Sequence, residues 1–421
     1  MSDKGSWDWQ PGKRELAAVD AVRKEYQAVH ELVVSPDGER IAAPVVLGEG
    51  AASAMVNGQV WPRTFEKLWY VRFGGSGQLI ALGRIDDEWT VVVEGEPWEE
   101  RFEFAWQPKF SANGRSVGVL YKRDNLYGVA VDGKPWDSGF VAIRDFCLSP
   151  DGSRAAATVQ IENLKSADIF SFFQGVWSVA ADGVAWEQRF VNAWSPCFSA
   201  DGSRVAAEVR TGNSEYSIAV DSRPWQERFG CVWAPLFRGN GGGVLAPALK
   251  DGKWTLMENG APLWKGRYNQ LWHQVVSPDG NRIAAVASPA FGDWTVVVDD
   301  SPWGARFREM VLPPVFSPDG RSVAVLVKEN DCWTVAVDGK AWGQAFDMAW
   351  DPIFTPCGTH VLAKVRKNGA HACALDGRVS ARTFDELWDP VCSPDGRQVL
   401  LRYIEGGKYF REVVSLERVI G

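Results

Sequence analysis

The sequence has little histidine and no paired cysteine motif. Its 421 residues include four histidines and seven cysteines. No two of these cysteines form a Cys-x-x-Cys pair. Scattered thiols of odd number do not fit a disulfide framework, a zinc ribbon, a cysteine-ligated iron–sulfur cluster or a c-type haem. We therefore expect no cofactor and no metal site, and we interpret the thiols as small buried side chains in a reducing compartment. The cysteines are Cys147, Cys197, Cys231, Cys332, Cys357, Cys373 and Cys392.

The sequence also lacks a long apolar run and an excess of positive charge. No stretch approaches the ~20 apolar residues of a membrane-spanning helix, and residues 1–16 lack the apolar run of a secretory signal. We expect a cytoplasmic protein that is peripheral to the inner membrane at most, through partner subunits. The 45 basic and 53 acidic residues give a net charge of -8. Such a balance argues against nucleic-acid binding, because contacts with phosphates need a basic face.

Motifs of enzymes are absent as well. There is no Gly-x-Ser-x-Gly nucleophile elbow, although residues 74–78 come close, and no calcium-binding Asp-x-Asp-x-Asp-Gly loop. The glycine run at 239–243 is not followed by the Lys-Ser/Thr of a phosphate-binding loop. We predict that the protein is not an enzyme and has no catalytic residues. Carboxylates that converge in a central channel stay open as an alternative.

What the sequence does contain is a repeat, which indicates the fold more directly than any motif. A Ser-Pro-Asp-Gly turn is intact at residues 35–38, 149–152, 277–280, 317–320 and 393–396, and variants of it fill the intervals. The closing glycines lie 37 to 40 residues apart, except for one interval of 50. They are Gly38, Gly77, Gly114, Gly152, Gly202, Gly241, Gly280, Gly320, Gly358 and Gly396. Proline, aspartate and glycine in this order favour a tight hairpin closed by a bulge.

Tryptophans follow the same period. One class precedes the aromatic residue that stands before each turn, a second class follows that residue, and a third opens the strand before an Asp-Gly turn. The first class is Trp61, Trp98, Trp136, Trp186, Trp225, Trp264, Trp303 and Trp342. The second is Trp69, Trp106, Trp194, Trp233, Trp272, Trp350 and Trp388. The third is Trp89, Trp177, Trp254, Trp294 and Trp333. Recurrence at fixed positions is most simply explained by packing between repeats.

Each unit reads as four short strands, and units of this length without linkers are typical of a β-propeller. We predict an all-β propeller of about ten four-stranded blades, formed by the single domain 1–421. Before Gly38 the chain supplies a segment like strand D around Tyr26 and then a strand A, and after Gly396 it supplies only strands B and C. These incomplete units sum to about one blade, so we expect the N- and C-terminal strands to pair and close the ring. Two five-bladed rings remain an alternative. Residues 1–23 are interpreted as an N-terminal extension, in which 13–23 also fit a short amphipathic helix.

The Ser-Pro-Asp-Gly turn followed by an apolar strand resembles the WD40-like propeller family of TolB type, over nearly the whole chain. This resemblance implies a fold and no particular activity. The tryptophan content is also similar to that of the tryptophan-rich cytoplasmic subunit of the transmembrane electron-transfer complex of sulfate-reducing bacteria. The narrower resemblance implies partners, namely a membrane cytochrome b and haem or iron–sulfur subunits, and no cofactor within the propeller itself.

Two features are candidates for contacts with partners. Tryptophans of the second class stand where one repeat crosses to the next, so they can form an aromatic mouth of the ring; all seven are candidates. The long interval is caused by an insertion at 161–175, which we expect to form a long hairpin in the fourth repeat. Its bulky apolar residues predict a partner contact. They are Ile169, Phe170, Phe172 and Phe173.

The sequence therefore favours a non-catalytic scaffold. Its expected role is that of an accessory subunit that holds or positions the redox subunits of a membrane-bound electron-transfer complex. Two alternatives stay open at this stage. One is a sensor whose aromatic mouth binds a small ligand or a peptide, and the other is an enzyme with carboxylates in the central channel.

Overall fold

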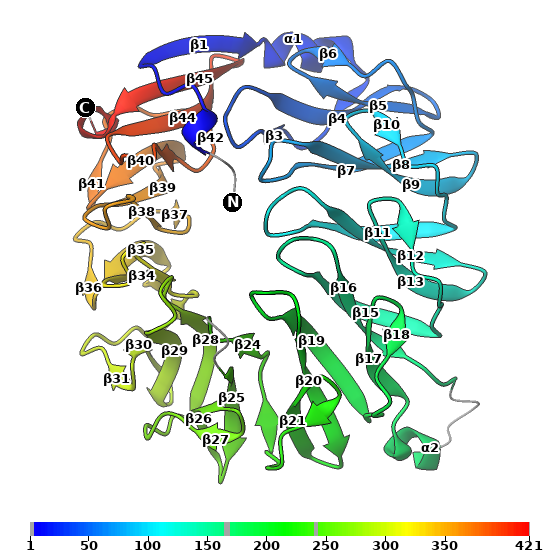
Figure 1. Cartoon of the computed structure of the whole chain (residues 1–421). Helices are drawn as coiled ribbons and strands as arrows, with labels where there is room; N and C mark the ends of the chain where they lie inside the picture. Colours follow the sequence, from blue (N-terminus) through cyan, green and yellow to red (C-terminus); the bar gives the residue numbers. More distant parts are fainter. Residues whose placement is uncertain (1–3, 164–168, 240–242, 421) are drawn as a thin grey trace.

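Ten antiparallel sheets form the protein. The computed structural model describes residues 4–163, 169–239 and 243–420, and these residues form ten sheets that follow one another around a single ring (Figure 1). In nine of the sheets the strands pair in chain order, and in the tenth the N-terminal strand pairs with the last strand of the chain, so every sheet is a meander whose strands we name A, B, C and D. Strand A lies toward the middle of the ring, and strand D lies at its rim. The prediction of one ten-bladed propeller is confirmed, and the alternative of two five-bladed rings is wrong.

The first five blades are built as follows. Blade 1 contains β2 (Ala28–Val29), β3 (Val33–Val34), β4 (Ile41–Gly48), β5 (Ala51–Val56) and β6 (Gln59–Val60). Blade 2 contains β7 (Lys67–Phe73), β8 (Leu79–Ile85), β9 (Glu88–Val93) and β10 (Glu96–Pro97). Blade 3 contains β11 (Phe104–Phe110), β12 (Val117–Arg123), β13 (Leu126–Val131) and β14 (Lys134–Pro135). Blade 4 contains β15 (Ala142–Leu148), β16 (Ala155–Gln160), β17 (Trp177–Ala181) and β18 (Val184–Ala185). Blade 5 contains β19 (Asn192–Phe198), β20 (Val205–Gly212), β21 (Glu215–Val220) and β22 (Arg223–Pro224).

The remaining blades repeat this plan. Blade 6 contains β23 (Cys231–Val232), β24 (Leu236–Phe237), β25 (Val244–Lys250), β26 (Lys253–Glu258) and β27 (Ala261–Pro262). Blade 7 contains β28 (Gln270–Val276), β29 (Ile283–Ala290), β30 (Asp293–Val298) and β31 (Ser301–Pro302). Blade 8 contains β32 (Met310–Val311), β33 (Val315–Phe316), β34 (Val323–Glu329), β35 (Cys332–Val337) and β36 (Lys340–Ala341). Blade 9 contains β37 (Met348–Ala349), β38 (Ile353–Phe354), β39 (Val361–Lys367), β40 (Ala370–Leu375) and β41 (Arg378–Val379). Blade 10 contains β42 (Glu386–Leu387), β43 (Val391–Cys392), β44 (Gln398–Glu405), β45 (Lys408–Ser415) and β1 (Gly12–Ala17).

The Ser-Pro-Asp-Gly turn joins strands A and B, as the sequence predicts. In blade 8 the amide of Gly320 donates to the carbonyl of Ser317 at 2.8 Å. The hydroxyl of Ser317 donates to the carboxylate of Asp319 at 2.6 Å, and the same carboxylate accepts the amide of Arg321 at 3.1 Å. Gly320 has φ +70, a backbone conformation that favours glycine. Side-chain and main-chain bonds therefore fix the same hairpin.

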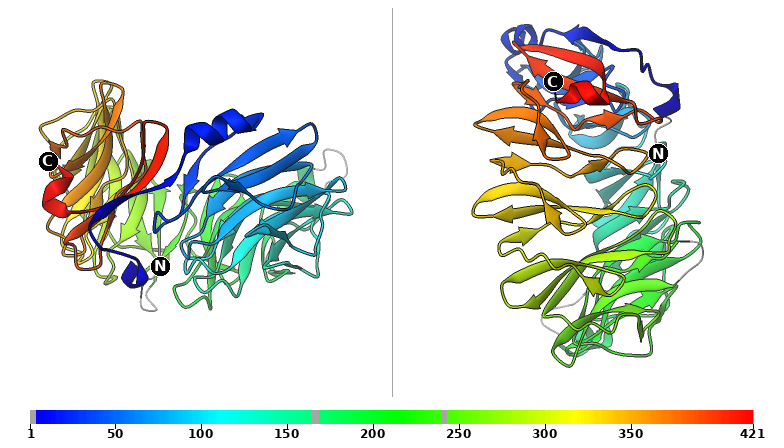
Figure 2. Two further views of the ribbon diagram at one scale, coloured as in Figure 1. Left: turned by 90° about the horizontal axis from the view of Figure 1, so that it is seen from above. Right: turned by 90° about the vertical axis from the view of Figure 1, so that its left-hand side faces the viewer.

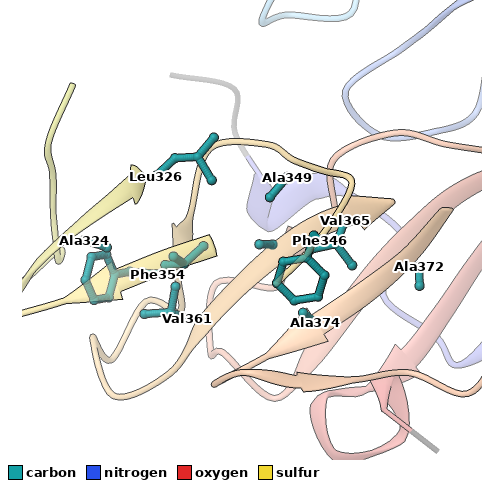
Figure 3. Close-up of a cluster of buried hydrophobic side chains, with 11 residues drawn as sticks. Ala324, Leu326, Phe346, Ala349, Phe354, Val361, Val365, Ala372 and Ala374 are labelled. Carbon is teal, nitrogen blue, oxygen red and sulfur yellow. The ribbon is translucent and has the colours of Figure 1, made fainter. Parts of the chain in front are cut away.

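Neighbouring blades share the hydrophobic cores. The cluster in Figure 3 joins β34 of blade 8 with β39 and β40 of blade 9, around the fully buried ring of Phe346. Phe346 itself bridges to Trp333 at the start of strand C. Because strands B and C have a neighbouring sheet on both faces, they are mostly apolar and buried over their central residues. The triplet Trp342, Phe346 and Trp350 is not helical; Phe346 forms an isolated bridge, and the two tryptophans lie just outside strands.

Closure of the ring uses both ends of the described chain. Strand β1 pairs antiparallel with β45 and becomes strand D of blade 10 (Figure 2). The expected pairing of N- and C-terminal strands is thus confirmed. Within the segment interpreted as an N-terminal extension, helix α1 spans only Val19–Glu25, so 13–23 do not form one helix. The strand D expected near Tyr26 lies instead at β1, which reaches the edge of β45 that would otherwise be open.

Three further short helical segments lie outside the blades or between their strands. These are the 3-10 helices η1 (Lys4–Ser6) and η2 (Leu416–Val419) and the helix α2 (Ile169–Gln174). Helix α2 stands in the connection between β16 and β17, within the insertion at 161–175. The insertion was expected to be a hairpin, and the described part of it is helical. Figure 1 shows α2 at the rim of the ring beside blade 4.

Tryptophans of the first class pack between neighbouring blades at the rim of the ring. Six of these eight indoles pack on the glycine of the turn between strands C and D of the following blade, as Trp342 of blade 8 does on Gly377 of blade 9. A Cβ added to Gly377 would stand 3.1 Å from Cγ of Trp342, and Gly377 has φ +78. Glycine is favoured at this position because its backbone is left-handed and because the indole leaves little room for a Cβ.

We expect Gly377→Ala to destabilise the protein by about 2–3 kcal/mol, because a left-handed non-glycine residue costs roughly 1–2 kcal/mol and the indole must also shift. Gly369→Ala is the matched control. Gly369 lies in the same blade with φ +80, and a Cβ added there would meet nothing within 4 Å. The difference between the urea midpoints of the two variants measures the contribution of Trp342. Equal midpoints would show that the indole does not constrain the turn.

Candidate functional site

The second tryptophan class lies on strand A, where each indole packs against the residue that opens strand C of its own blade. The pairs, with the distances between ring centroids, are Trp69–Trp89 (4.5 Å), Trp106–Tyr127 (6.0 Å), Trp194–Tyr216 (6.4 Å), Trp233–Trp254 (5.2 Å), Trp272–Trp294 (4.7 Å), Trp350–His371 (5.5 Å) and Trp388–Tyr409 (5.8 Å). Since the starts of strands A and C lie at the same edge of a meander, all seven pairs are on one face of the ring. The Ser-Pro-Asp-Gly turns are on the other face.

Of these seven candidates, Trp194, Trp233 and Trp272 meet in one pocket, and Trp69 lines a second. The remaining three, Trp106, Trp350 and Trp388, are half-buried against their own blades. Whether all seven form one aromatic mouth stays a prediction.

A bulge in strand A sets the direction of these indoles. The register of β19 against β20 shifts between Trp194 and Cys197, and that of β28 against β29 shifts between Trp272 and Val275. The residues directly after the two tryptophans, Ser195 and His273, have φ 48 and φ 54. Bulges of this kind redirect side chains next to functional sites and at the rims of sheets. Here they direct polar residues toward the same space as the indoles.

The pocket that holds three of the indoles lies along the inner strands of blades 4 to 7 and has a volume of about 780 Å³. We call it the inner pocket. Besides the indoles of Trp194, Trp233 and Trp272, it is lined by Asp145 from β15, Glu208 from β20 and His273 from β28. Its volume is within the range of sites for small ligands and large side chains. Among the described residues, no lysine or arginine lines it.

Electrostatics in the inner pocket favour positive charge. Burial, with the nearby carboxylate of Asp145 as the second cause, raises the pKa of Glu208 to about 7. The Asp145 carboxylate accepts the amide of Ser195 at 3.3 Å. Burial lowers the pKa of His273, so its imidazole is neutral at pH 7 and adds no compensating charge. The inner pocket therefore combines flat aromatic faces with two carboxyl groups.

A second feature is an exposed aromatic surface over blades 2 and 3. Its members are each more than two-fifths exposed, at 43% for Trp69, 41% for Tyr70, 44% for Phe104 and 43% for Leu126. We call it the aromatic patch. Phe104 lies between two indoles, with its ring 6.0 Å from Trp89 and 5.8 Å from Trp106. A depression of about 530 Å³ beside Trp69 and Tyr70 continues it toward blade 1. Apolar surface of this density on one face is typical of a contact with another molecule.

The partner-contact candidates of the insertion lie on α2. Phe173 is 42% exposed and Phe172 is half-buried, and their rings meet edge to face at 5.5 Å. The side chains of Ile169 and Phe170 lie outside the described residues. Whether this helix contacts a partner stays a prediction.

Sequence reasoning did not find Asp145, Glu208 or His273. One signal was available for Glu208, since a carboxylate interrupts the apolar first half of strand β20, Val-Ala-Ala-Glu-Val. Asp145 and His273 carried no signal, because the strand A bulges that direct them are not visible in the sequence.

In the described part of the chain, no group of three or more histidine, cysteine, aspartate or glutamate side chains is arranged to hold a metal ion. No described helix is both long and apolar enough to cross a membrane. The thiols of Cys147, Cys197 and Cys373 are mostly or fully enclosed, and burial raises the pKa of each to about 12. These three cysteines are therefore protonated at neutral pH and unreactive.

Comparison with known proteins bears on the fold. No family model and no curated protein matches the sequence. Among solved structures, the chain is similar to a eukaryotic initiation factor, with 12% identity, 96% of this chain and 97% of the other covered, and a TM-score of 0.42. It is also similar to the Dos1 propeller, with 9% identity, coverage of 74% and 88%, and a TM-score of 0.36. TolB from Acinetobacter baumannii matches with 12% identity, coverage of 60% and 58%, and a TM-score of 0.28. Identities this low carry no information about activity or partners.

Proposed function

We propose that the protein is a non-catalytic scaffold that holds partner proteins on one face of its ring. The observation that carries this proposal is the aromatic patch, in which Trp69, Tyr70, Phe104 and Leu126 stay exposed while the other aromatic residues of these blades pack into cores. Large rigid aromatic side chains contribute much of the free energy of protein–protein contacts. The propeller itself supplies a rigid platform for them.

The resemblance of the tryptophan pattern narrows the proposed partners to the haem, iron–sulfur and cytochrome b subunits of a membrane-bound electron-transfer complex. In this proposal the protein carries no electrons and is peripheral to the membrane through those subunits. The insertion helix α2, with Phe172 and Phe173, is a second proposed contact. Purification from native membranes in mild detergent tests this assignment, since stoichiometric co-elution with haem or iron–sulfur subunits is expected. A chain that elutes alone would contradict it.

The variant Tyr70→Asn/Phe104→Thr should reduce recovery of the partner at least tenfold without lowering the melting temperature. Asparagine tolerates the left-handed conformation of Tyr70, which has φ 56, and threonine suits the strand position of Phe104. Loss of one or two exposed aromatic anchors typically costs more than 1 kcal/mol each in binding. The measurement is the ratio of partner to scaffold after affinity purification.

Phe291→Ser is the control for this variant. Phe291 is 99% exposed and lies apart from the aromatic patch, in the turn between β29 and β30. We expect this variant to recover the partner as the wild type does. Equal recovery by the patch variant and the control would exclude the aromatic patch as the docking surface. Phe173→Ser in the same experiment reports on helix α2 separately.

The pair Asp145 and Glu208 favours a second candidate, an enzyme that uses the two groups as base and acid. A carboxyl group with a pKa near neutrality beside a second carboxyl group is the arrangement of several acid–base sites. Hydrolysis of a panel of chromogenic glycosides and esters, abolished by Glu208→Gln, would support this function. Turnover that is unchanged in the variant would reject it.

A further inference from the structure

The carboxyl groups of the inner pocket form no salt bridge with any described residue. Glu208 has no hydrogen-bond or ion-pair partner for its carboxylate among the described residues, and Asp145 accepts only the amide of Ser195 there. Elsewhere many carboxyl groups of this protein are paired with a basic side chain, as Glu405 is with Lys13 at 2.6 Å. The closest basic side chain in sequence, Arg144, donates instead to the amide oxygen of Asn192 at 2.6 Å. Unpaired carboxylates among apolar rings are costly unless a cation approaches them.

In two blades of this ring a basic side chain lies over the face of an indole. In blade 9 the ammonium group of Lys364 lies 3.9 Å from the ring centroid of Trp350, the strand A tryptophan. In blade 4 the guanidinium of Arg144 lies 3.9 Å from the ring centroid of Trp177. Attraction between a cation and the face of an indole contributes about 0.5–2 kcal/mol. The aromatic positions of this fold are therefore built in a geometry that accepts ammonium and guanidinium groups.

Among the described residues, no cation lies over the strand A tryptophans of blades 5 to 7, and Arg210 of blade 5 lies instead over Tyr216, at 5.9 Å from its ring centroid. The residue on strand B that pairs with the strand A tryptophan is Lys364 in blade 9. In blades 5, 6 and 7 the same position holds Glu208, Pro247 and Val286. Within the described chain no lysine or arginine lies over the indoles of Trp194, Trp233 or Trp272. The inner pocket thus has the aromatic faces and the carboxylates, and only the cation is missing.

We propose that the inner pocket binds the guanidinium group of an arginine side chain carried by a partner protein. The indoles supply flat faces on which the planar group stacks, and the two carboxyl groups accept its hydrogen bonds. Arginine fits better than lysine because its guanidinium stacks on aromatic rings and pairs with carboxylates in a bidentate manner. The inference rests on the proposed scaffold function, since it assigns the arginine to a partner of that scaffold.

Titration calorimetry with two short peptides tests the site directly. One peptide carries a central arginine, and the other carries citrulline, which has the same shape without the charge. We expect the arginine peptide to bind at least tenfold more tightly than the citrulline peptide, with affinity in the millimolar range or better. Equal affinities, or no binding of the arginine peptide at about 10 mM, would overturn the inference.

Variants of the pocket locate the binding. Asp145→Asn/Glu208→Gln preserves shape and removes both charges, and Trp233→Leu removes one exposed indole face. Each should weaken binding of the arginine peptide at least tenfold while the far-ultraviolet spectrum and the melting temperature stay at wild-type values. Trp388→Leu, on strand A of blade 10, is the control outside the pocket and should bind normally. Unchanged affinity in both pocket variants would place the arginine elsewhere and refute the site.

The dependence on pH gives a readout that a purely structural role would not produce. A cation binds the ionised form of Glu208, so affinity for the arginine peptide should be highest above pH 8 and fall as the pH drops through about 7. The other titratable groups around this carboxyl are Asp145 on β15, Cys231 on β23 and His273 on β28. Protonation of His273 acts in the same direction at lower pH, because burial lowers the pKa of its imidazole. His273→Gln should therefore retain the transition near pH 7, and Glu208→Gln should remove it. A transition near pH 7 that persists in Glu208→Gln would contradict the assignment.

Failure of this inference is distinguishable from failure of the scaffold function. If the wild type recovers its partner and Asp145→Asn/Glu208→Gln recovers it equally well, the pocket is not the arginine site and the scaffold proposal stands. If the arginine peptide binds as expected but the chain elutes from native membranes alone, the site stands and the proposed complex is wrong.

Discussion

Deletion of residues 1–17 should lower the melting temperature by roughly 5–10 °C and make the protein associate at high concentration. The deletion removes β1, whose residues pair with β45 from Gly12–Val413 to Ala17–Tyr409. About five backbone hydrogen bonds of ~1 kcal/mol each are lost, and for a chain of this size each kcal/mol lowers the melting temperature by about 1–2 °C. Edge ion pairs disappear as well, among them Lys408–Glu15 at 2.9 Å. The newly exposed edge of β45 is then free to pair with a second molecule.

Deletion of residues 1–6 is the matched control for this prediction. It leaves β1 in place and also retains Asp8, whose carbonyl accepts a hydrogen bond from Arg411. We expect a change of less than about 2 °C and no association, because η1 is one short 3-10 segment that contains no buried residue and lies outside the sheets. Calorimetry and light scattering across a concentration series separate the two effects. If the longer deletion has the same melting temperature as the control, pairing of β1 with β45 does not contribute to the stability of the ring.

Most of the propeller could be predicted from the sequence because every blade carries its own signals. The turn at Ser317–Gly320 uses bonds within six residues, and Phe346 bridges a residue only thirteen positions away. These short-range sequence signals recur in all ten repeats, so each repeat supports the assignment of the others. The number of blades follows from the number of closing glycines once the ring is known to be continuous.

The prediction placed the strand that closes the ring near Tyr26 instead of at β1, because β1 is the edge strand of its sheet. Four of the six residues of β1 are exposed and only Ala17 is buried, so the apolar alternation that marks an internal strand is missing. Its conformation is dictated by β45, almost 400 residues away. Sequence periodicity favoured the region around Tyr26 instead, where α1 and a short connection lead into blade 1.

The inner pocket could not be predicted for a related reason. Its walls come from four consecutive blades and span residues 145–274, and the curvature of the ring decides which indoles face one another. Trp194, Trp233 and Trp272 meet there, whereas Trp350 has the same place in its repeat and is covered by Lys364. A single substitution on strand B thus changes the role of a tryptophan that looks equivalent in the sequence.

The second large effect is expected at the contact that seals blade 10 against blade 1. Arg411 is only 2% exposed, and its Nε donates to the carbonyl of Asp37 at 2.8 Å and lies 2.9 Å from the carboxylate of Glu39. Nearby, Arg402 donates to the carbonyl of Ser35 at 2.9 Å. The Tyr409 hydroxyl donates to the carbonyl of Gly38 at 2.8 Å. Three side chains of the C-terminal strands therefore hold the first Ser-Pro-Asp-Gly turn of the chain.

Arg411→Met should destabilise the protein by about 3–5 kcal/mol, because it leaves buried carbonyl groups without donors and removes one cation from Glu39. Arg411→Lys should fall in between, since a single ammonium cannot reach the acceptors on both sides. Arg397→Met, at an exposed arginine directly after the last Ser-Pro-Asp-Gly turn, is the control and should change stability by less than about 0.5 kcal/mol. Guanidinium denaturation followed by tryptophan fluorescence measures all three midpoints. Because Arg402 donates to the same turn, the losses of stability caused by Arg402→Met and Arg411→Met should be less than additive. Full additivity would mean that the two arginines stabilise the turn independently.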